Sequence, residues 1–518
     1  MKVLLTTLNS QYVHSNLALK YLYTVSVKEE CDCELREFTI NNDRNYIFTE
    51  ILRPDYNLVC FSCYVWNIEE IKRLCAELKL AKPDMKIALG GPEVSYNAVE
   101  FMQENWWADF ILTGEGEYPF YRFVQELNPR SKEKYGIETI PNLVYRDNEE
   151  ATIYENQAME PLEFSSIPFP YSLLDCEKDK VVYYESSRGC PFNCSYCMSS
   201  IDKSVRTLPI DRVRQELSYF LYKKVPQVKF VDRTFNFDRK RALEIVNYIL
   251  ENDNGVTNFH LELCADLVDD ELLNAFSKAR KGLFQVEIGI QSINPQTLKA
   301  VNRNENVNPV LYNTEKIIEL GNIHVHVDLI SGLPFEDITL FEKSFDRVYK
   351  LGANAFQLGF LKMLKGTSLY NEAEQYAIVY RETAPYEVIS TKYMSAGDFV
   401  SLKMIDKMLD TYYNRGGFSN IMEYLIKVFE DKNADFGPFR FYKILSEFYY
   451  DKGFQNRDRR KDDQYRSLYS FICDASKKGI IDDEEKAKEI LDYDARKNMD
   501  ELNYGRFIRK GWEEIING

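Results

Sequence analysis

Three closely spaced cysteines are the residues of this chain best suited to chemistry. Cys190, Cys194 and Cys197 stand in the run RGCPFNCSYC at 188–197, a C-x3-C-x2-C spacing directly after a predicted strand. Three thiolates on one short loop can bind three irons of a 4Fe–4S cube and leave the fourth iron open. A structural zinc site needs a fourth ligand, and no further Cys or His stands nearby in the sequence. The spacing therefore predicts an iron–sulfur cluster with one open iron.

The elements that must position this loop form a series of alternating strands and helices. Apolar runs predict strands at Val181–Ser187, Val228–Val231, Phe259–Cys264, Phe284–Ile290, His324–Ser331 and Ala355–Leu361. Helical patterns separate them, such as Ile210–Tyr222, Arg239–Ile249 and Phe341–Leu351. Six β/α units predict a partial (β/α)6 barrel, in which chemistry lies on the loops that follow the strands.

The first 150 residues show a second alternating pattern. It predicts strands at Val3–Leu8, Leu35–Ile40, Leu58–Val65, Lys86–Gly90 and Phe110–Thr113, and helices at Ile68–Leu80 and Val94–Glu104. Such alternation favours a doubly wound, Rossmann-like α/β sheet, which binds ligands at the carboxyl ends of its strands. The residues at those ends include Asn9, Gly90, Gly91, Gly114 and Gly116. A glycine there lets the backbone approach a ligand, or it only makes a tight turn.

The remaining segments complete the domain plan. The proline-rich run Ser165–Pro170 breaks the periodicity, and long helical patterns such as Phe399–Tyr413 and Ile421–Phe429 dominate the C-terminal part. We expect a sheet domain at 1–150, a linker at 151–175, a barrel at 176–369 and a mainly helical domain at 370–518 that covers the barrel mouth.

Composition excludes several classes of protein. The chain of 518 residues has 65 Lys+Arg and 81 Asp+Glu, a formal charge of −16, so broad nucleic-acid binding is not expected. A hydrophobic content of 45% is that of a globular protein. Eleven scattered cysteines do not form a disulfide framework and indicate a reducing cytoplasm. The N-terminal apolar run is too short for a signal peptide, and no stretch is long enough for a membrane helix, so no membrane partner is expected.

The cysteine spacing and three barrel segments resemble the radical S-adenosylmethionine (SAM) superfamily. The segments are VDRTFN at 231–236, EIGIQS at 287–292 and DLISGLP at 328–334, with Arg233 in place of a second acid. The resemblance implies that the open iron binds the amino and carboxylate groups of SAM and that one electron yields a 5′-deoxyadenosyl radical. It also implies SAM contacts from Tyr196, Asp232, Glu262, Gln291, Ser292 and Gly332, with Arg188, Arg206 or Arg233 as partner of the SAM carboxylate. Glu262 equally suits a salt-bridged core acid.

A doubly wound domain before such a barrel is similar to the cobalamin-binding radical SAM enzymes, over nearly the whole chain. The segments NSQYVHSNLALKYL, HVDLISGLP and QLGFLKMLKGT resemble a bacterial branch with a helical C-terminal domain. The resemblance implies cobalamin between the two domains, with its nucleotide tail in a slot of the sheet domain that the four glycines line and with Asn9 as a further contact.

The sequence does not decide whether a side chain binds the lower face of cobalt. The usual cobalt-ligand motif D-x-H-x-x-G is incomplete, because YVHSNL at 12–17 keeps only His14. His14 either binds cobalt through an imidazole nitrogen or only packs polar loop atoms, since the orienting acid is missing.

Other cysteines and histidines have weaker patterns. Cys60 and Cys63 form a C-x2-C pair, but on a strand they face opposite sides, which predicts a buried structural role. Cys31 and Cys33 face one side of a strand and make only a weak metal site. His324 and His326 alternate on the fifth barrel strand, where we expect one to face the substrate and the other to be polar core.

The resemblance implies an enzyme that transfers a methyl group from SAM, by way of cobalamin, to an unactivated carbon. Three alternatives stay open: a cobalamin-dependent rearrangement or ring contraction, a tRNA methylthiotransferase-like enzyme, and a non-enzymatic cobalamin sensor. Methylthiotransferases hold a second cluster with N-terminal cysteines, where this chain has Leu8-Asn9. A sensor has no need of an open iron. An electron donor such as flavodoxin or ferredoxin is the implied partner, and neither the substrate nor a catalytic side chain is indicated.

Overall fold

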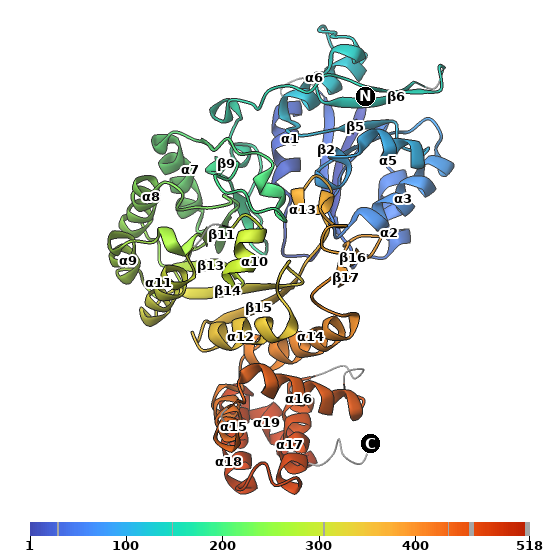
Figure 1. The fold of residues 1–518 in the computed structure, drawn as a ribbon. Helices are drawn as coiled ribbons and strands as arrows, with labels where there is room; N and C mark the ends of the chain where they lie inside the picture. The colour runs from blue at the N-terminus through green and yellow to red at the C-terminus, as the bar shows by residue number, and fades with distance from the viewer. Residues whose placement is uncertain (28–30, 148, 304–305, 434, 455–459, 513–518) are drawn as a thin grey trace. The chain divides into compact units, whose positions relative to one another are not determined.

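The computed structural model describes residues 1–27, 31–147, 149–303, 306–433, 435–454 and 460–512 (Figure 1). The chain divides into two compact units. Unit 1 comprises Met1–Val286, Lys362–Ala373 and Tyr380–Glu387, and unit 2 comprises Glu287–Leu361, Glu374–Val379 and Val388–Gly518. Within the described residues, no helix is long and apolar enough to cross a membrane.

A seven-stranded sheet with the order β2-β1-β3-β4-β5-β6-β7 begins unit 1. The five predicted strands are present and parallel: β1 (Lys2–Asn9), β2 (Asp32–Thr39), β3 (Leu58–Ser62), β4 (Lys86–Gly90) and β5 (Phe110–Leu112). An antiparallel pair not predicted from the sequence, β6 (Leu143–Asp147) and β7 (Thr152–Glu155), extends the sheet into the predicted linker. The strand order reverses between β1 and β3, and ligands of such sheets bind at the carboxyl ends beside this point.

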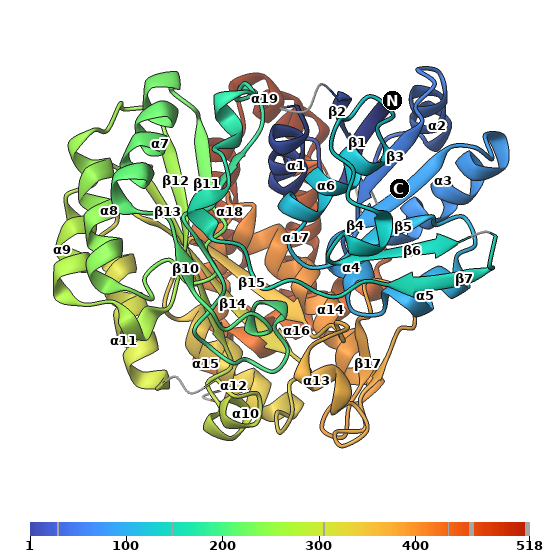
Figure 2. The ribbon, with the colours of Figure 1, turned by 90° about the horizontal axis from the view of Figure 1, so that it is seen from above.

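Helices cover both faces of this sheet (Figure 2). On one face lie α1 (Leu17–Val27) and α6 (Glu117–Leu127); on the other lie α2 (Arg44–Leu52), α3 (Ile68–Ala81) and α5 (Ala98–Glu104). Each face has its own apolar core, and Cys60 belongs to the first and Cys63 to the second. Burial raises the pKa of both thiols, so their predicted structural role is confirmed and a shared metal is not supported.

One predicted helix is split in two. In place of Val94–Glu104 the chain forms α4 (Pro92–Ser95) and then α5. The Ser95 hydroxyl donates to the Gly91 carbonyl at 2.8 Å, and such a local side-chain bond competes with continuation of the helix.

A second sheet has the order β15-β14-β13-β12-β11-β8, with the strands in the sequence of the chain, as an open barrel requires. The strands are β8 (Val182–Tyr184), β11 (Gln227–Phe230), β12 (Asn258–Leu263), β13 (Phe284–Gln291), β14 (His324–Ser331) and β15 (Ala355–Phe360). Connecting helices include α7 (Ile210–Lys223), α8 (Arg239–Glu251), α9 (Asp270–Ser277), α11 (Val307–Glu319) and α12 (Ile338–Tyr349). The predicted partial barrel is confirmed.

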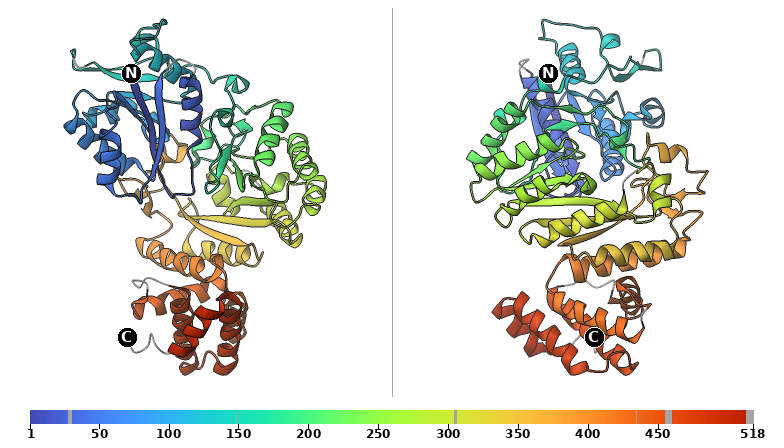
Figure 3. Two further views of the ribbon diagram at one scale, coloured as in Figure 1. Left: turned by 180° about the vertical axis from the view of Figure 1, so that it is seen from behind. Right: turned by 60° about the vertical axis from the view of Figure 1, so that its left-hand side comes forward.

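The C-terminal part of unit 2 is helical, as predicted (orange to red in Figure 3). Its helices are α14 (Ala396–Leu409), α15 (Ser419–Lys432), α16 (Pro438–Asp451), α17 (Lys461–Lys477), α18 (Glu484–Asn498) and α19 (Glu501–Lys510). A π-helical turn, Asp410–Asn414, follows α14. Its Asn414 side chain bonds both the amide and the carbonyl of Phe356, at 2.9 Å each, and so caps the edge strand β15.

Candidate cofactor site

The three cysteines lie on a loop between two short paired strands. The strand β9 (Ser187–Arg188) pairs antiparallel with β10 (Arg206–Thr207), and we call residues 187–207 the cysteine hairpin. Cys190 and Cys194 are buried and Cys197 is half-buried. Gly189 has φ +87°, and a Cβ there would lie 2.3 Å from the Ser204 carbonyl oxygen. The hairpin closes on itself so tightly that only glycine fits before the first cysteine.

A cube and a single metal ion ask for different arrangements of thiolates. In the described part of the chain, no three His, Cys, Asp or Glu side chains are grouped to hold one metal ion. A 4Fe–4S cube spreads three thiolates over three separate irons. A mononuclear site at the hairpin is therefore not supported, and the cube stays a prediction from the cysteine spacing.

Asp232 fixes the chain that enters the cysteine hairpin. Its buried carboxylate accepts hydrogen bonds from the Ser186 amide (2.7 Å), the Ser186 hydroxyl (2.5 Å) and the Ser187 hydroxyl (2.8 Å). The predicted strand Val181–Ser187 is consequently interrupted between β8 and β9, since Ser186 bonds to this carboxylate. These contacts give Asp232 a positioning role, and a direct contact with SAM stays a prediction.

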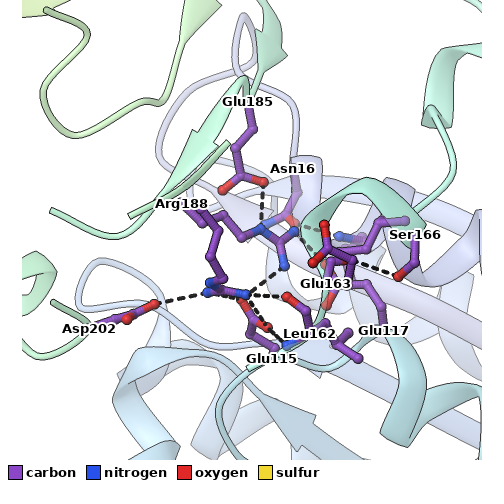
Figure 4. Close-up of polar contacts among 12 residues, drawn as sticks. Asn16, Glu115, Glu117, Leu162, Glu163, Ser166, Glu185, Arg188 and Asp202 are labelled. Atoms are coloured by element: carbon purple, nitrogen blue, oxygen red, sulfur yellow. Dashed lines mark hydrogen bonds and ion pairs between the residues drawn. The ribbon is translucent and has the colours of Figure 1, made fainter. Parts of the chain in front are cut away.

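Ion pairs tie the cysteine hairpin to the sheet domain within unit 1 (Figure 4). Arg188 contacts Glu185 at 3.0 Å, Glu115 at 3.2 Å and Glu117 at 2.6 Å. Arg206 contacts Glu115 at 2.7 Å and Asp202 at 2.9 Å. Two arginines thus meet four carboxylates, and Glu115 is shared by both arginines. We call these six residues the hairpin network.

Burial and charge act in opposite directions inside the hairpin network. Burial raises the pKa of Glu185 to about 7 in spite of the neighbouring Arg188. At Glu115 burial acts the same way, but the Arg206 hydrogen bond and the Arg188 charge outweigh it and lower the pKa of that carboxyl. The network therefore holds one carboxyl, Glu185, that titrates near neutrality beside Glu115, whose pKa is held below its ordinary value.

Arg233 differs from the other two candidate arginines. It follows Asp232, is exposed, and pairs with no acid among the residues that the structure describes. Arg188 and Arg206 are already committed to carboxylates of the chain. Arg233 is thus the candidate whose guanidinium is available to an external carboxylate.

A cavity of about 440 Å³ lies among the carboxyl ends of the sheet strands, α1, α6 and the cysteine hairpin. We call it the first cavity. All four predicted glycines line it, with apolar side chains of the sheet domain and residues of the hairpin: Leu19, Leu22, Cys60, Leu112, Phe120, Arg188 and Met198. The lining also includes the charged residues Glu115, Glu117, Asp202 and Arg233, so the space is apolar only in part, and that part suits the flat base of a nucleotide tail.

The four glycines are not equivalent. At Gly91, φ is +101° and a Cβ would lie 2.5 Å from the Cys63 carbonyl oxygen, so the backbone itself requires glycine. At Gly90 and Gly116 the nearest atoms to a built Cβ are 3.5 and 3.4 Å away, which is ordinary contact. The absence of a side chain at Gly90 and Gly116 is therefore not demanded by the fold and leaves room in the first cavity.

A second cavity of about 500 Å³ adjoins the first, and five residues line both: Ala18, Tyr64, Glu117, Arg188 and Arg233. His14, Tyr183 and the stacked pair Tyr64 and Trp66 line it; the ring centroids of that pair are 4.5 Å apart. Asn9 also lies here, not with the glycines. Its amide nitrogen donates to Glu37 at 2.6 Å and to the His14 carbonyl at 3.0 Å, so it holds the loop after β1.

Family models match three consecutive parts of the chain. Residues 3–124 match the B12 binding domain and residues 184–348 match the radical SAM superfamily. The chain carries a B12-binding domain followed by a radical SAM domain. Residues 374–515 match a family described as a protein of unknown function, DUF4080. The predicted boundaries at 150, 175 and 369 fall between these matches and stay predictions.

Known proteins are similar to parts of this chain. The cobalamin-dependent radical SAM methyltransferase TokK of Streptomyces tokunonensis is 24% identical over 60% of this chain and 48% of its own length. The chain spans about half to three-fifths of the curated relatives it matches first.

Two solved structures show the same fold. OxsB, a cobalamin-dependent SAM radical enzyme with aqua-cobalamin bound, has a TM-score of 0.61 and 15% identity over 99% of this chain and 84% of its own. TsrM of Kitasatospora setae, with cobalamin and a 4Fe–4S cluster bound, has a TM-score of 0.60 and 18% identity over 74% and 80%. The fold of this chain is therefore that of structures with cobalamin and iron–sulfur sites.

The radical SAM domain also contains the predicted SAM contacts outside the hairpin. In unit 2, Gln291 has φ +68°, and Gly332 has φ +90° with the Phe399 ring 2.7 Å from a built Cβ. The Ser292 hydroxyl donates to Glu336 at 2.5 Å. In unit 1, Glu262 is half-buried, and so is Tyr196, which lies within the cysteine hairpin itself. Their contact with SAM stays a prediction.

The sequence did not indicate Glu336 as a residue of the site, and the histidine pair differs from its prediction. Glu336 is fully buried, also accepts from Ser344 at 3.1 Å, and burial raises its pKa to about 7. His324 and His326 lie on one face of β14 with their Nε2 atoms 2.9 Å apart, so the expected division of roles between them is not seen.

Proposed function

We propose that this protein uses cobalamin and SAM to transfer a methyl group to an unactivated carbon of its substrate. The observation that carries the proposal is the hairpin network. It fastens the three cysteines to the glycine-lined first cavity within one compact unit. A cluster and a corrinoid held by these two parts would lie close together, as a methyl transfer through both requires.

Different residues of the chain bind the cluster, SAM and cobalamin. The thiolates of the cysteine hairpin hold three irons and leave one for SAM. Arg233, which pairs with no acid of the described residues, offers its cation to the SAM carboxylate. Gly90 and Gly116 leave space for a nucleotide tail, and Tyr64 with Trp66 gives the second cavity a flat aromatic wall. When bound, cobalamin supplies a methyl carrier and the cluster with SAM supplies a 5′-deoxyadenosyl radical.

The proposal implies a reducing environment. All eleven cysteines are free, and the cluster needs an electron for each radical it forms. We propose the cytoplasm as the compartment and a low-potential donor such as flavodoxin or ferredoxin as the partner.

Isotope labelling tests the proposal. Anaerobically purified, reconstituted protein is analysed for iron and cobalt, reduced, and given SAM with a deuterated methyl group. We expect 5′-deoxyadenosine in solution and a CD3 group on the bound cobalamin, both detected by mass spectrometry. 5′-Deoxyadenosine without any labelled cobalamin would reject methyl transfer and favour a rearrangement, which uses the same cofactors. Failure to bind cobalamin would reject the proposal altogether.

A further inference from the structure

The loop that carries His14 is fastened at both ends. One carboxylate oxygen of Glu37 accepts from the Asn9 side chain at 2.6 Å and from the Asn16 amide at 2.9 Å. Between these points the chain leading into β8 grips the loop. The Val181 amide donates to the Val13 carbonyl at 2.8 Å, and the Ser15 hydroxyl donates to the Val181 carbonyl at 3.1 Å. These four hydrogen bonds thus fix the backbone on both sides of His14.

One nitrogen of His14 is engaged by a phenol. The Tyr183 hydroxyl lies 2.7 Å from Nδ1 of His14. Among the described residues, this hydroxyl has no other hydrogen-bond partner. Burial lowers the pKa of His14 and raises that of Tyr183 to about 12. Near neutral pH the imidazole is therefore uncharged, with one N–H, and the phenol keeps its proton.

The direction of this hydrogen bond decides what His14 can do. A phenol is both donor and acceptor, whereas the unprotonated nitrogen of an imidazole only accepts. If Nδ1–H donated, the phenolic proton and the Nε2 lone pair would both be without a partner in the described part of the chain. If Tyr183 donates, the ring proton must be on Nε2, and only this N–H is without a partner among the described residues; it belongs to a side chain that lines the second cavity.

We infer that Tyr183 fixes His14 as the Nε2–H tautomer, so that His14 presents an N–H donor to the second cavity in place of a lone pair for cobalt. A histidine that binds a metal normally donates its other N–H to an acceptor, which is the reverse of this arrangement. The inference rests on the proposed function only for what lies opposite His14, namely an oxygen acceptor of the bound corrinoid.

Nuclear magnetic resonance tests the tautomer without any cofactor. The chain has four histidines, so protein labelled with 15N in the histidine rings gives few signals, and His14→Gln assigns those of His14. We expect Nδ1 without a proton and Nε2 with one. Tyr183→Phe should produce a mixture of tautomers. Tyr12→Phe, which removes a neighbouring hydroxyl bonded to Asp179 at 2.7 Å, should leave the signals unchanged. A proton on Nδ1 in the wild type would overturn the inference.

Electron paramagnetic resonance tests the consequence at cobalt. Reduced cobalamin bound to the wild type should show no three-fold nitrogen splitting of its cobalt lines, and His14→Ala should give the same pattern. Splitting in the wild type that disappears in His14→Ala would overturn the inference. If the wild type binds no cobalamin, the proposed function fails, whereas the resonance result on the tautomer still stands.

Discussion

The cysteine hairpin and the first cavity are built by opposite means. Charged side chains hold the hairpin: Arg188, with a side chain only 10% exposed, is surrounded by three carboxylates. The first cavity is shaped by apolar packing and by missing side chains. The cluster half of the site should therefore respond to changes of charge, and the corrinoid half should respond to changes of volume.

Removing the thiolates should have the largest effect and should separate the two halves completely. With Cys190, Cys194 and Cys197 all changed to Ala, iron should fall from about four per chain to near zero, because no ligand of the cube remains. Cobalamin binding should persist, since the first cavity is untouched. Iron analysis and visible spectra of reconstituted protein check both expectations. Cys176→Ala, a half-buried cysteine outside the hairpin, is the control, and iron retained in the triple variant would refute the assignment.

Arg188→Ala tests the charge dependence of the hairpin. It leaves Glu185, Glu115 and Glu117 without their shared cation, and breaking a buried ion pair by removing one partner costs about 3–5 kcal/mol. We expect a loss of this order in the free energy of unfolding, measured by chemical denaturation, and a faster loss of iron. Arg44→Ala, which removes exposed pairs with Glu70 and Glu77, should cost about 0–1 kcal/mol. An equal loss in the free energy of unfolding for the two variants would contradict the view that charged side chains hold the hairpin.

The two halves also differ in how well the sequence predicts them. The cysteine spacing is local, so the cluster loop can be predicted from the sequence without knowledge of the fold. Several predicted strands of the first sheet are apolar runs, such as LVCFS in β3 and FIL in β5, whereas β6 and β7, with LVYRD and TIYE, mix polar with apolar residues. The glycines mark strand ends, but only the structure shows that a Cβ at Gly91 would collide with the Cys63 carbonyl oxygen, whereas Gly90 leaves room for a ligand.

Long-range polar pairs could not be predicted from the sequence. Arg188 and Glu115 are 73 residues apart, and His14 and Tyr183 are 169 residues apart. No spacing rule connects side chains across such distances. The sequence therefore left Arg188 as a candidate partner of the SAM carboxylate. Nothing in the sequence indicated that Tyr183 lies beside His14.

Glu185→Gln tests a carboxyl of the hairpin network that titrates near neutrality. Burial raises its pKa from 4.5 to about 7, so the folded protein keeps a proton that the unfolded chain releases. Stability is then highest below the unfolded pKa and falls as the pH rises to about 7, by up to about 3 kcal/mol. Denaturation at several pH values should show this fall in the wild type and a smaller one in Glu185→Gln. The exposed variant Glu104→Gln should keep the wild-type slope; an unchanged slope in Glu185→Gln would contradict the assignment.

Filling the first cavity tests the volume dependence of the corrinoid half. Gly90 ends β4, has no positive φ, and a Cβ there is 3.5 Å from its nearest neighbour, the Leu112 carbonyl oxygen. Gly90→Val should therefore fold normally and bind iron normally. Its side chain would occupy space that we assign to the nucleotide tail, and we expect cobalamin affinity to fall about tenfold, or ~1.4 kcal/mol.

Cobinamide, a corrinoid without the nucleotide tail, makes the Gly90→Val test specific. If the tail lies in the first cavity, Gly90→Val should weaken cobalamin binding and leave cobinamide binding as in the wild type, both followed by equilibrium titration. Gly91→Ala is the contrasting variant: its Cβ would meet the Cys63 carbonyl oxygen at 2.5 Å, so it should lower the melting temperature and weaken both ligands together. Equal weakening of both ligands by Gly90→Val, with an unchanged melting temperature, would show that the first cavity holds some part of the corrinoid other than the tail.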